Sequence, residues 1–332
     1  MSLVVGTGYE SLGRKRDRKL LPQIGQSIDI GGRTLNIYCS GTGSPAVIFD
    51  AGAGSPGFSW GEIQPQIARR TRACWYDRAG EGWSDPGPFP RTSAAIARDL
   101  HELLARARVP APYVLVGHSF GGLTARVYVG LYPTEVAGIV LIEAAHEDEP
   151  VRAPPMFVGP KPPRFLWHSL HLLFMGAARV GIIRLVTPKA FLPADPAQRT
   201  RAQVVAALRA RPQFIATANS SGLVAPDSYA EARAAGGLGD RPLLVLTRGQ
   251  PFGHDPDPAI DRQLSTYFHV WVHELQAQLA RLSTRGRQVI VQSSGHDIPA
   301  EAPQEVVTAI GEVVEASRAS SLPNQGLQQP RP

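Results

Sequence analysis

A ten-residue stretch, from Tyr113 to Gly122, constrains the fold of this chain more than any other. Its first four residues, Tyr-Val-Leu-Val, are apolar or aromatic, as in a fully buried strand. The pentapeptide Gly-His-Ser-Phe-Gly follows, and apolar residues then recur at helical spacing as far as Leu131. Pentapeptides of this type arise by chance in a chain with 33 glycines, but the flanking strand and helix argue against chance. Strand, G-x-S-x-G and helix together predict a nucleophile elbow that raises the Ser119 hydroxyl above a sheet.

Strands and helices alternate on both sides of this elbow. Two alternating strands around Gly31 and Gly32 predict a β-hairpin over residues 26–39. Further strands are expected at 46–49, 72–76, 136–142, 242–246 and 288–291, and helices at 63–68, 93–106, 261–282 and 303–317. Alternation of this kind predicts an α/β protein with a mostly parallel sheet covered on both faces.

The alternation divides the chain into segments. Two core segments, 26–149 and 240–318, are separated by a helical insertion at 150–239. The insertion is proline-rich at first and dense in Leu, Phe and Ile over 165–186, with helical stretches around 199–210 and 228–234. Residues 1–25 lack clean periodicity and are expected to form a lightly packed arm. Residues 319–332 are rich in Gln and Pro and are expected to be disordered.

The charge pattern bears on partners and location. The 34 basic residues exceed the 28 acidic ones, but most are scattered arginines, and only residues 14–19 form a basic cluster. Without an aromatic-interleaved basic stripe, we expect a surface arm and no binding of nucleic acid. No apolar run has the length of about 18 residues that a membrane helix needs. The short apolar start, residues 1–6, would fit the remnant of an anchor, which leaves a cytoplasmic and a membrane-associated or extracytoplasmic location open.

Four motifs in a fixed order give the chain a strong resemblance to the α/β-hydrolase superfamily, outside the arm and the tail. They are the strand and loop at 49–54, the loop at 77–84, the elbow at 117–121, and Ser-Gly-His at 294–296. The chain is most similar to lipase- and esterase-like members with a Tyr-Asp-Arg-Ala-Gly loop. The resemblance implies an eight-stranded, mostly parallel sheet with a helical cap inserted after the sixth strand. It also implies that Asp77 and Arg78 brace the sheet.

Ser119 is the expected nucleophile, and it needs a histidine base within hydrogen-bond reach. His296 follows the last strand and satisfies the chain order of serine, acid and histidine. His118 adjoins the serine, but we expect the elbow to point it away. Five further histidines of the nine lie in predicted helices, where packing or surface roles are commoner: His101, His168, His171, His269 and His273.

Two main-chain N–H groups are expected to form the oxyanion hole. One belongs to Phe120, directly after the nucleophile. The resemblance assigns the other to Ala53, in the loop after the third strand, where the usual His-Gly of the family reads Ala51-Gly52. A plain glycine-rich turn is the alternative for this loop. A dinucleotide-binding loop is not supported, because no third glycine lies at the required distance.

The acid of the catalytic group has several candidates. In most of the superfamily it follows the strand after the cap, where this chain offers only the late Asp255 and Asp257. Some relatives place the acid at the end of the preceding strand instead, and Glu143 occupies that position. We favour Glu143, with Asp255 as the alternative and Asp257 after it. A purely structural role for Glu143 at the strand end stays open.

The two cysteines, Cys39 and Cys74, lack metal-ligand spacing. In the family's fold their strands are neighbours, which would bring the thiols close together. A disulfide is expected if the protein works outside the cytosol, and two reduced, buried thiols are the equal alternative.

These expectations favour a serine hydrolase that cleaves small-molecule carboxylic esters, without a cofactor or a metal. The apolar insertion argues for an apolar substrate, because cap residues usually wall the pocket. Cleavage of amides, peptides or C–C bonds by the same residues is an alternative, and a non-catalytic binding protein on the same fold is another. A further alternative is a lipid hydrolase that contacts the membrane peripherally through the basic cluster and residues 165–186. The sequence leaves the oligomeric state open.

Overall fold

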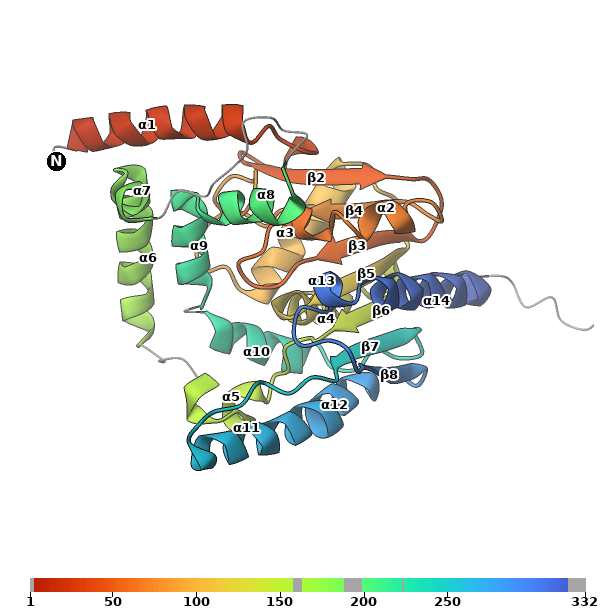
Figure 1. Ribbon diagram of the computed structural model, residues 1–332. Coiled ribbons are helices and arrows are strands. Elements are labelled where there is room, and N and C mark those ends of the chain that lie inside the picture. The colour runs from red at the N-terminus through yellow and green to blue at the C-terminus, as the bar shows by residue number, and fades with distance from the viewer. Residues whose placement is uncertain (1–2, 158–162, 188–198, 223, 322–332) are drawn as a thin grey trace, which may run out of the picture.

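The computed structural model describes residues 3–157, 163–187, 199–222 and 224–321 (Figure 1). Its centre is one sheet of eight strands in the order β1-β2-β4-β3-β5-β6-β7-β8. The strands are β1 (Gln26–Asp29), β2 (Thr34–Ser40), β3 (Ala46–Asp50), β4 (Ala73–Tyr76), β5 (Tyr113–His118), β6 (Val136–Ile142), β7 (Leu243–Arg248) and β8 (Gly286–Val291). β2 pairs antiparallel with β1 and β4, and all other neighbours pair parallel. The expected α/β-hydrolase architecture is confirmed.

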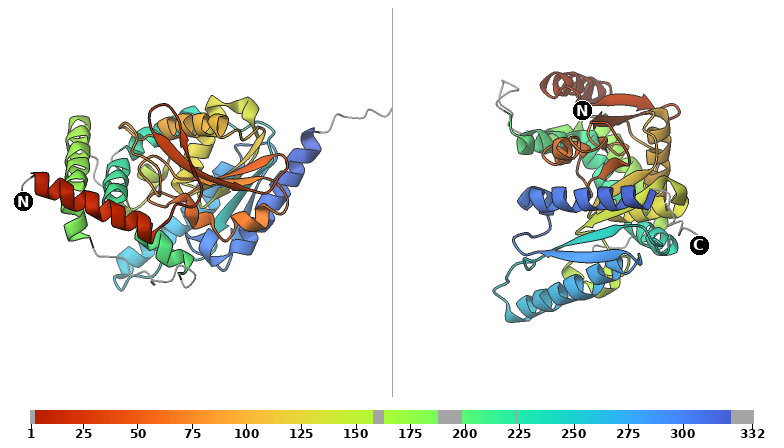
Figure 2. Two further views of the ribbon diagram at one scale, coloured as in Figure 1. Left: turned by 90° about the horizontal axis from the view of Figure 1, so that it is seen from above. Right: turned by 90° about the vertical axis from the view of Figure 1, so that its right-hand side faces the viewer.

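Helices cover both faces of this sheet (Figure 2). One face is covered by α3 (Ser93–Arg106), α4 (Phe120–Leu131), α10 (Ala225–Ala234) and α12 (Gln276–Ala280). The other is covered by α2 (Gln64–Ile67) and α14 (Pro303–Ser321). Successive side chains of β5 alternate between the two cores, with Leu115 on one side and Val114 and Val116 on the other. This two-sided burial explains why the central strands read as continuous apolar runs.

Every described element between β6 and β7 is helical. The elements are α5 (Glu149–Arg152), a 3₁₀ turn (Pro155–Phe157), α6 (Arg164–Arg179), α7 (Ile182–Val186), α8 (Arg201–Arg209), α9 (Pro212–Gly222) and α10. α10 packs on α3 and α4, so it belongs to the layers of the sheet, whereas α6 and α9 pack on each other away from it. α9 was not expected, because its Ser, Thr, Asn and Ala residues show no apolar stripe.

The expected N-terminal arm is helical and mostly exposed, and its lack of clean periodicity did not predict the helix. Residues Leu3–Leu20 form α1, an 18-residue helix that packs against α6. Its inward side carries Gly6, Glu10 and Asp17 in place of large apolar residues, and Arg184 of α7 pairs with both carboxylates. Because the inner face consists of small and charged residues, it shows no apolar repeat of 3.6 residues. The hydrophobic pattern therefore does not predict this helix.

The remaining helical segments lie near the C-terminus. α11 (Pro258–Val270) continues through a π-helical turn (Trp271–Leu275) into α12, and α13 (Ile298–Glu301) precedes α14. α14 runs to Ser321, so the expected tail begins later than 319, and residues 322–332 lie outside the described part of the chain. Among the helices described, none is both long and apolar enough to span a membrane.

Cys39 of β2 and Cys74 of β4 face each other directly across an antiparallel pair and form a disulfide. Their Cα atoms are 4.1 Å apart, and 35 residues separate them in sequence. This resolves the alternative between a disulfide and two free thiols. Chain-entropy arguments give a bridge over such a loop a stabilisation of about 3–4 kcal/mol.

Candidate functional site

Ser119 lies in a strained turn between β5 and α4. Its φ and ψ are 52° and −120°, a conformation that residues other than glycine adopt at a free-energy cost. The turn is tight: a Cβ on Gly117 would lie 2.5 Å from the Gly121 carbonyl oxygen, and one on Gly121 would lie 2.4 Å from that of Asp50. Only glycine fits at both positions, so the G-x-S-x-G spacing follows from packing.

Glu143 occupies the equivalent position on the neighbouring strand. β5 and β6 run parallel with His118 beside Ile142, so Ser119 and Glu143 follow directly at the same edge of the sheet. Glu143 also has a positive φ of 44°, and its side chain is fully buried. A buried carboxylate in strained backbone is costly, which points to a functional constraint at this strand end.

Four groups surround the Glu143 carboxylate. The Arg248 N–H donates to Oε1 at 2.7 Å, and the Trp271 indole N–H lies 3.0 Å from Oε1 and 3.2 Å from Oε2. The Arg248 Nε lies 3.3 Å from Oε2, and the His296 Nδ1 lies at the same distance from that oxygen. The hydrogen bonds from the Arg248 N–H and the Trp271 indole, together with the charge of the Arg248 guanidinium, compensate the desolvation of the carboxylate. Trp271 begins the π-helical turn, a distortion that is frequent at functional sites.

His296 lies in the loop after β8, and half of its side chain is exposed. The loop is held by Glu301 of α13, whose Oε2 accepts hydrogen bonds from the Ser294 hydroxyl at 2.8 Å and the Gly295 N–H at 2.6 Å. The hydrogen bond from Ser294 is the main reason that the pKa of Glu301 is lowered, with the Gly295 N–H adding to it. Both donors favour the ionised carboxylate, which fixes the loop that presents the imidazole.

His118 does not point away from the site, contrary to expectation. Its Nε2 lies 2.9 Å from the main-chain oxygen of His296, and the two imidazole rings are 5.0 Å apart. Since a carbonyl oxygen only accepts, the Nε2 of His118 must carry the proton. Burial, and after it the nearby His296, lower the pKa of His118 to about 4, so this ring stays neutral and holds the His296 loop from the sheet side.

Ser119 lies between two cavities. One, of about 430 Å³, is lined by Ser119, His118, His296 and residues of α8. The other, of about 260 Å³, is lined by Ser119, Phe120, Ala218 and Tyr229 among others. Among the hydrogen bonds of the described residues, none joins the Ser119 hydroxyl to His296. Such bonds are often long in ligand-free enzymes and tighten when substrate binds.

The two expected oxyanion donors, Ala53 and Phe120, flank Ser119 in the smaller cavity. Neither N–H donates a hydrogen bond to another group within the described residues, so both are available to a ligand. Gly52 allows the loop that carries Ala53 to approach Ser119 closely, because a Cβ at Gly52 would lie 3.2 Å from His118 Nδ1 and 3.4 Å from the Ser119 Cβ.

Arg78 braces the loop that carries Ala53. Its guanidinium donates to the carbonyl oxygens of Ala51 and Gly52 and to the Asp50 carboxylate, and it lies 5.3 Å from the centre of the Phe120 ring. Its neighbour Asp77 accepts from the N–H groups of Gly57 and Trp83 and from the Asn36 amide, and so ties the segments of Gly57 and Trp83 to β2. Both residues therefore support the structure, as expected, and Arg78 also reaches the cavity wall.

The structure does not bring Asp255 or Asp257 to His296. The Asp255 carboxylate accepts from the Asp257 N–H at 2.9 Å, and Asp257 caps α11 through the Ala259 N–H at 2.8 Å. Both carboxylates thus have local roles in starting a helix. The nearby His254 pairs with Asp261 at the surface. Within the described residues, no group of three or more His, Cys, Asp or Glu side chains could hold a metal ion.

Glu81 is a buried carboxylate in the wall of the smaller cavity that sequence reasoning did not single out. Its Oε2 has no hydrogen-bond partner among the described residues, and the nearest guanidinium nitrogen, of Arg78, is 3.8 Å away. Burial raises the pKa of Glu81 to about 7, although the charge of Arg78 opposes the shift. The side chain therefore changes protonation near neutral pH, next to Ser119.

We predict that Glu81→Gln changes how stability depends on pH. Between the ordinary glutamate pKa and about 7, the folded protein binds more protons at Glu81 than the unfolded chain does, so its free energy of unfolding falls as pH rises. Gln cannot ionise, so the free energy of unfolding of the variant lacks this decline. Relative to the wild type, it should therefore rise by about 3 kcal/mol from pH ~4.5 to pH ~8. Urea unfolding at both pH values measures this. The exposed Glu102→Gln is the control, and a Glu81→Gln difference that stays constant with pH would contradict the assignment.

Comparisons with known proteins give the same fold. The model of the alpha/beta hydrolase family matches residues 47–309. A putative lipase from Acinetobacter baumannii AYE aligns over 94% of this chain and 97% of its own, with a TM-score of 0.59 and 19% identity. A thermophilic esterase from Thermogutta terrifontis aligns over 89% of this chain and 99% of its own, with a TM-score of 0.56 and 21% identity.

Among curated proteins, an uncharacterized protein of Schizosaccharomyces pombe is 40% identical over 83 residues. That match covers 25% of this chain and 16% of the yeast protein. In general, the matched part spans less than half of the length of the curated relatives.

Proposed function

Because the chain belongs to the alpha/beta hydrolase family, we propose that it is a serine hydrolase of carboxylic esters in which Ser119, His296 and Glu143 act as one catalytic unit. The observation that carries this proposal is the contact between the His296 imidazole and the Glu143 carboxylate. A fully buried Glu143 lies 3.3 Å from His296 Nδ1, and His296 shares a cavity with the strained Ser119.

The first half-reaction follows from this geometry. With its Nδ1–H directed at Glu143, His296 presents the unprotonated Nε2, which accepts the Ser119 proton as the hydroxyl oxygen attacks the ester carbonyl. The N–H groups of Phe120 and Ala53 stabilise the oxyanion that develops. His296 then gives its proton to the departing alcohol, and the acyl group stays on Ser119.

The second half-reaction reverses these roles. Water enters from the His296 side, His296 removes its proton, and the resulting tetrahedral intermediate collapses to release the acid and free Ser119. Glu143 keeps the imidazole in the required tautomer and stabilises the imidazolium in both halves. Its fixed hydrogen bonds to Arg248 and Trp271 hold the carboxylate in place throughout.

The two cavities suggest where the parts of the substrate bind. The leaving alcohol must lie near its proton donor, so it occupies the larger cavity, which contains His296. The acyl group then enters the cavity of about 260 Å³ between Phe120, Ala218 and Tyr229. Since a liquid water molecule takes up about 30 Å³, this space holds roughly eight or nine groups of that size, enough for an acyl chain of medium length. Residues of α8, α9 and α10 from the expected cap line the two cavities, whereas no described residue of α6 lines either of them.

We therefore predict a preference for acyl groups of short to medium length. Across p-nitrophenyl acetate, butyrate, octanoate and palmitate, kcat/KM should be highest at or below octanoate and fall at least about tenfold at palmitate, as expected where added methylenes no longer fit. The putative lipase and the esterase of similar fold support esters as the first substrates to test. An optimum at palmitate would contradict the acyl-site assignment. Absence of turnover on every ester, with amides cleaved instead, would contradict the ester proposal.

A further inference from the structure

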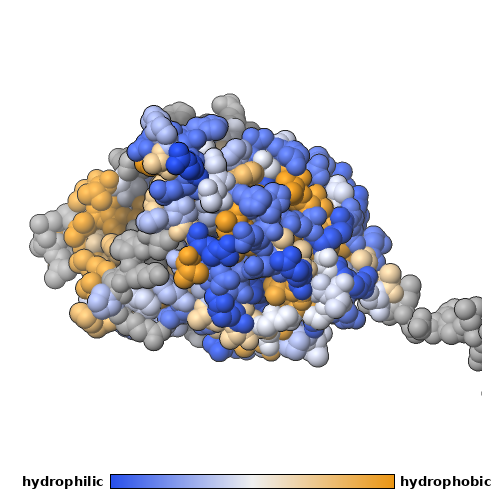
Figure 3. Space-filling model, turned by 90° about the horizontal axis from the view of Figure 1, so that it is seen from below, coloured by the Kyte–Doolittle hydropathy of each residue, from blue (hydrophilic) through white to orange (hydrophobic). Residues whose placement is uncertain are grey.

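One end of the molecule exposes an unusual number of large apolar side chains. They come from three helices: Val4, Val5 and Leu12 of α1, Phe165, Leu166, Leu172 and Leu173 of α6, and Ile182, Leu185 and Val186 of α7. Figure 3 shows apolar residues gathered at the left end, where Figure 1 places α6 and α7. We call these ten residues the apolar end. Contiguous apolar patches of this kind mark an interaction site on a folded protein.

α6 is apolar on opposite sides. Its inner side packs on α9 through buried or half-buried residues such as Trp167, Phe174 and Ala178. Its outer side repeats Phe165, Leu172 and neighbouring leucines at the spacing of one helical face, and those side chains are up to 77% exposed. A helix that is apolar all round is normally covered on all sides. Within the described residues, no protein segment covers the outer side of α6.

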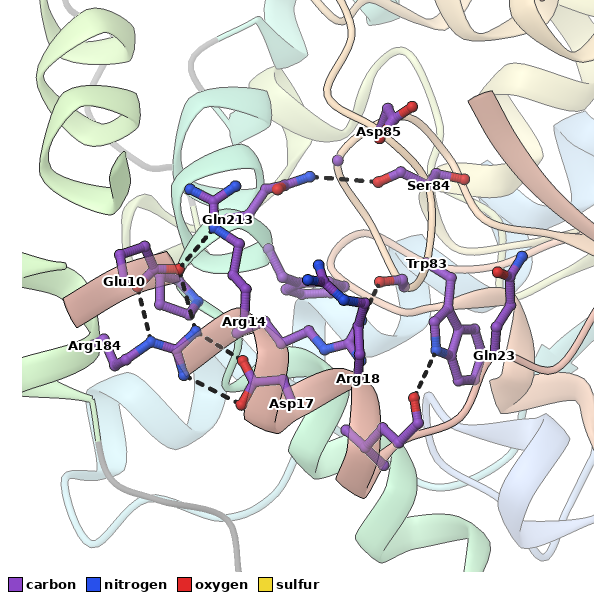
Figure 4. A pocket seen from close by; sticks show the side chains of 16 residues that line it. Glu10, Arg14, Asp17, Arg18, Gln23, Trp83, Ser84, Asp85, Arg184 and Gln213 are labelled. Carbon is purple, nitrogen blue, oxygen red and sulfur yellow. Dashed lines mark hydrogen bonds and ion pairs between the residues drawn. The ribbon is translucent and has the colours of Figure 1, made fainter. Parts of the chain in front are cut away.

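α1 separates its charges by side. Five basic residues are exposed, namely Arg14, Lys15, Arg16, Arg18 and Lys19. The only acidic residues of the helix, Glu10 and Asp17, turn inward to Arg184 of α7, as Figure 4 shows. Glu10 is 2% exposed. The outward side of α1 therefore carries exposed apolar side chains up to Leu12 and only basic charges over residues 14–19, its cationic half, of which Arg14 also pairs with Glu10 at 3.3 Å.

The three helices form a single surface. Arg184 links α7 to α1 through Nε to Glu10 at 2.8 Å and through Nη2 to Asp17 at 2.7 Å. α1 and α7 also pack closely, since a Cβ on Gly181 would lie 2.8 Å from the Tyr9 ring. α6 contacts both α1 and α7. The apolar end and the cationic half of α1 are thus held in a fixed arrangement.

We propose that this surface docks on an anionic phospholipid bilayer. The apolar end would enter the boundary of the acyl chains, while the cationic half of α1 would lie at the level of the phosphates. Charge complementarity selects this occupant, because a second copy of the chain would bring the same five basic residues together. The proposal does not rest on catalysis. It gives the apolar residues over 165–186 a role outside the substrate pocket.

The test is binding of the full chain to lipid vesicles, measured by flotation. Vesicles of phosphatidylcholine mixed with phosphatidylglycerol should carry the protein at low salt, and vesicles of phosphatidylcholine alone should carry much less. High salt should release most of it, because exposed charges are screened. Failure of the wild type to float with the anionic vesicles at low salt would overturn the proposal.

Variants separate the two components of the surface. Leu172→Glu with Leu173→Glu should weaken binding at least about tenfold, since two apolar side chains are lost from the lipid boundary. Lys15→Gln with Lys19→Gln should weaken it by about fivefold for each charge, and should reduce the salt dependence. Arg98→Gln with Arg262→Gln removes two exposed charges on other helices and should leave binding unchanged.

Two further readouts keep the outcome clear. Circular dichroism must show each variant folded, and turnover of a soluble ester should match the wild type, because these residues line neither cavity next to Ser119. Equal binding by wild type and both surface variants would overturn the proposal. So would lipid-free, concentration-dependent dimerisation of the wild type that Leu172→Glu with Leu173→Glu abolishes, since a second copy would then be the occupant.

Discussion

Ser119→Ala is expected to lower kcat/KM for p-nitrophenyl acetate by about 10⁴- to 10⁶-fold while the protein remains folded. The reason is that the reaction would lose its nucleophile, whereas the backbone of the elbow would lose nothing. Its turn is set by Gly117 and Gly121 and by the hydrogen bond from the Ser119 N–H to the Ile142 carbonyl at 3.0 Å, and none of these uses the hydroxyl. The melting temperature should therefore stay within a few degrees of the wild-type value.

The matched control is Ser265→Ala, an exposed serine on α11 that lines neither cavity next to Ser119. It should retain wild-type activity. A folded Ser119→Ala variant with more than about one hundredth of the wild-type kcat/KM would show that another group attacks the ester, since removing a true nucleophile costs far more.

Glu143→Gln should lower kcat by about 10⁴-fold, with a smaller change in KM. An amide keeps the shape of the carboxylate, but it can present its NH₂ to His296 and favour the wrong imidazole tautomer. It also removes the charge that stabilises the imidazolium. Asp255→Asn should leave kcat unchanged, because that carboxylate contacts the backbone of its own loop.

The Glu143 prediction needs a check on folding. The side chain pairs with the buried Arg248, and breaking a buried ion pair costs about 3–5 kcal/mol. Activity must therefore be compared at a temperature where circular dichroism shows native protein. Glu143→Asp keeps the charge and should recover part of the lost kcat. If Asp255→Asn lost activity and a folded Glu143→Gln did not, the assignment of the acid would be wrong.

Several features were predictable from sequence because local patterns determine them. The elbow followed from a buried strand, two required glycines and apolar residues at helical spacing, all within about 20 residues. The sheet followed from the alternation of apolar strands with helices. The placement of Glu143 next to Ser119 required only the strand order, because the carboxyl ends of adjacent parallel strands such as β5 and β6 share one edge.

Other features depend on long-range contacts between polar groups. α1 is held by the pairing of Glu10 and Asp17 with Arg184, which lies 167 or more residues further along the chain. Charged residues of this kind leave no apolar pattern in the sequence. The hydrogen bond from Trp271 to Glu143 joins residues that are 128 positions apart. In the sequence, an aromatic residue in a predicted helix is interpreted as a core residue, so this role of Trp271 was not predicted. His118 turns toward the site because its Nε2–H donates a hydrogen bond to the His296 carbonyl oxygen. The residues adjacent to His118 in sequence do not indicate this contact.

The density of Leu, Phe and Ile over 165–186 predicted helices correctly, but hydrophobicity alone does not tell which partner covers a helix. Here one side of α6 meets α9, and the other side faces outward at the apolar end. Only the three-dimensional arrangement separates residues that could line a substrate cavity from those that could meet a partner.

Covalent labelling tests the central claim most directly, namely that Ser119 is a nucleophile activated by His296 and Glu143. The wild type would be treated with an organic fluorophosphonate, followed by intact-mass measurement and mapping of the modified peptide. We predict one adduct per chain, located on Ser119, with labelling at least about 100-fold slower in His296→Ala and Glu143→Gln, as loss of the base or its orienting acid requires. An adduct on another residue, or equal labelling rates in all three proteins, would contradict the claim.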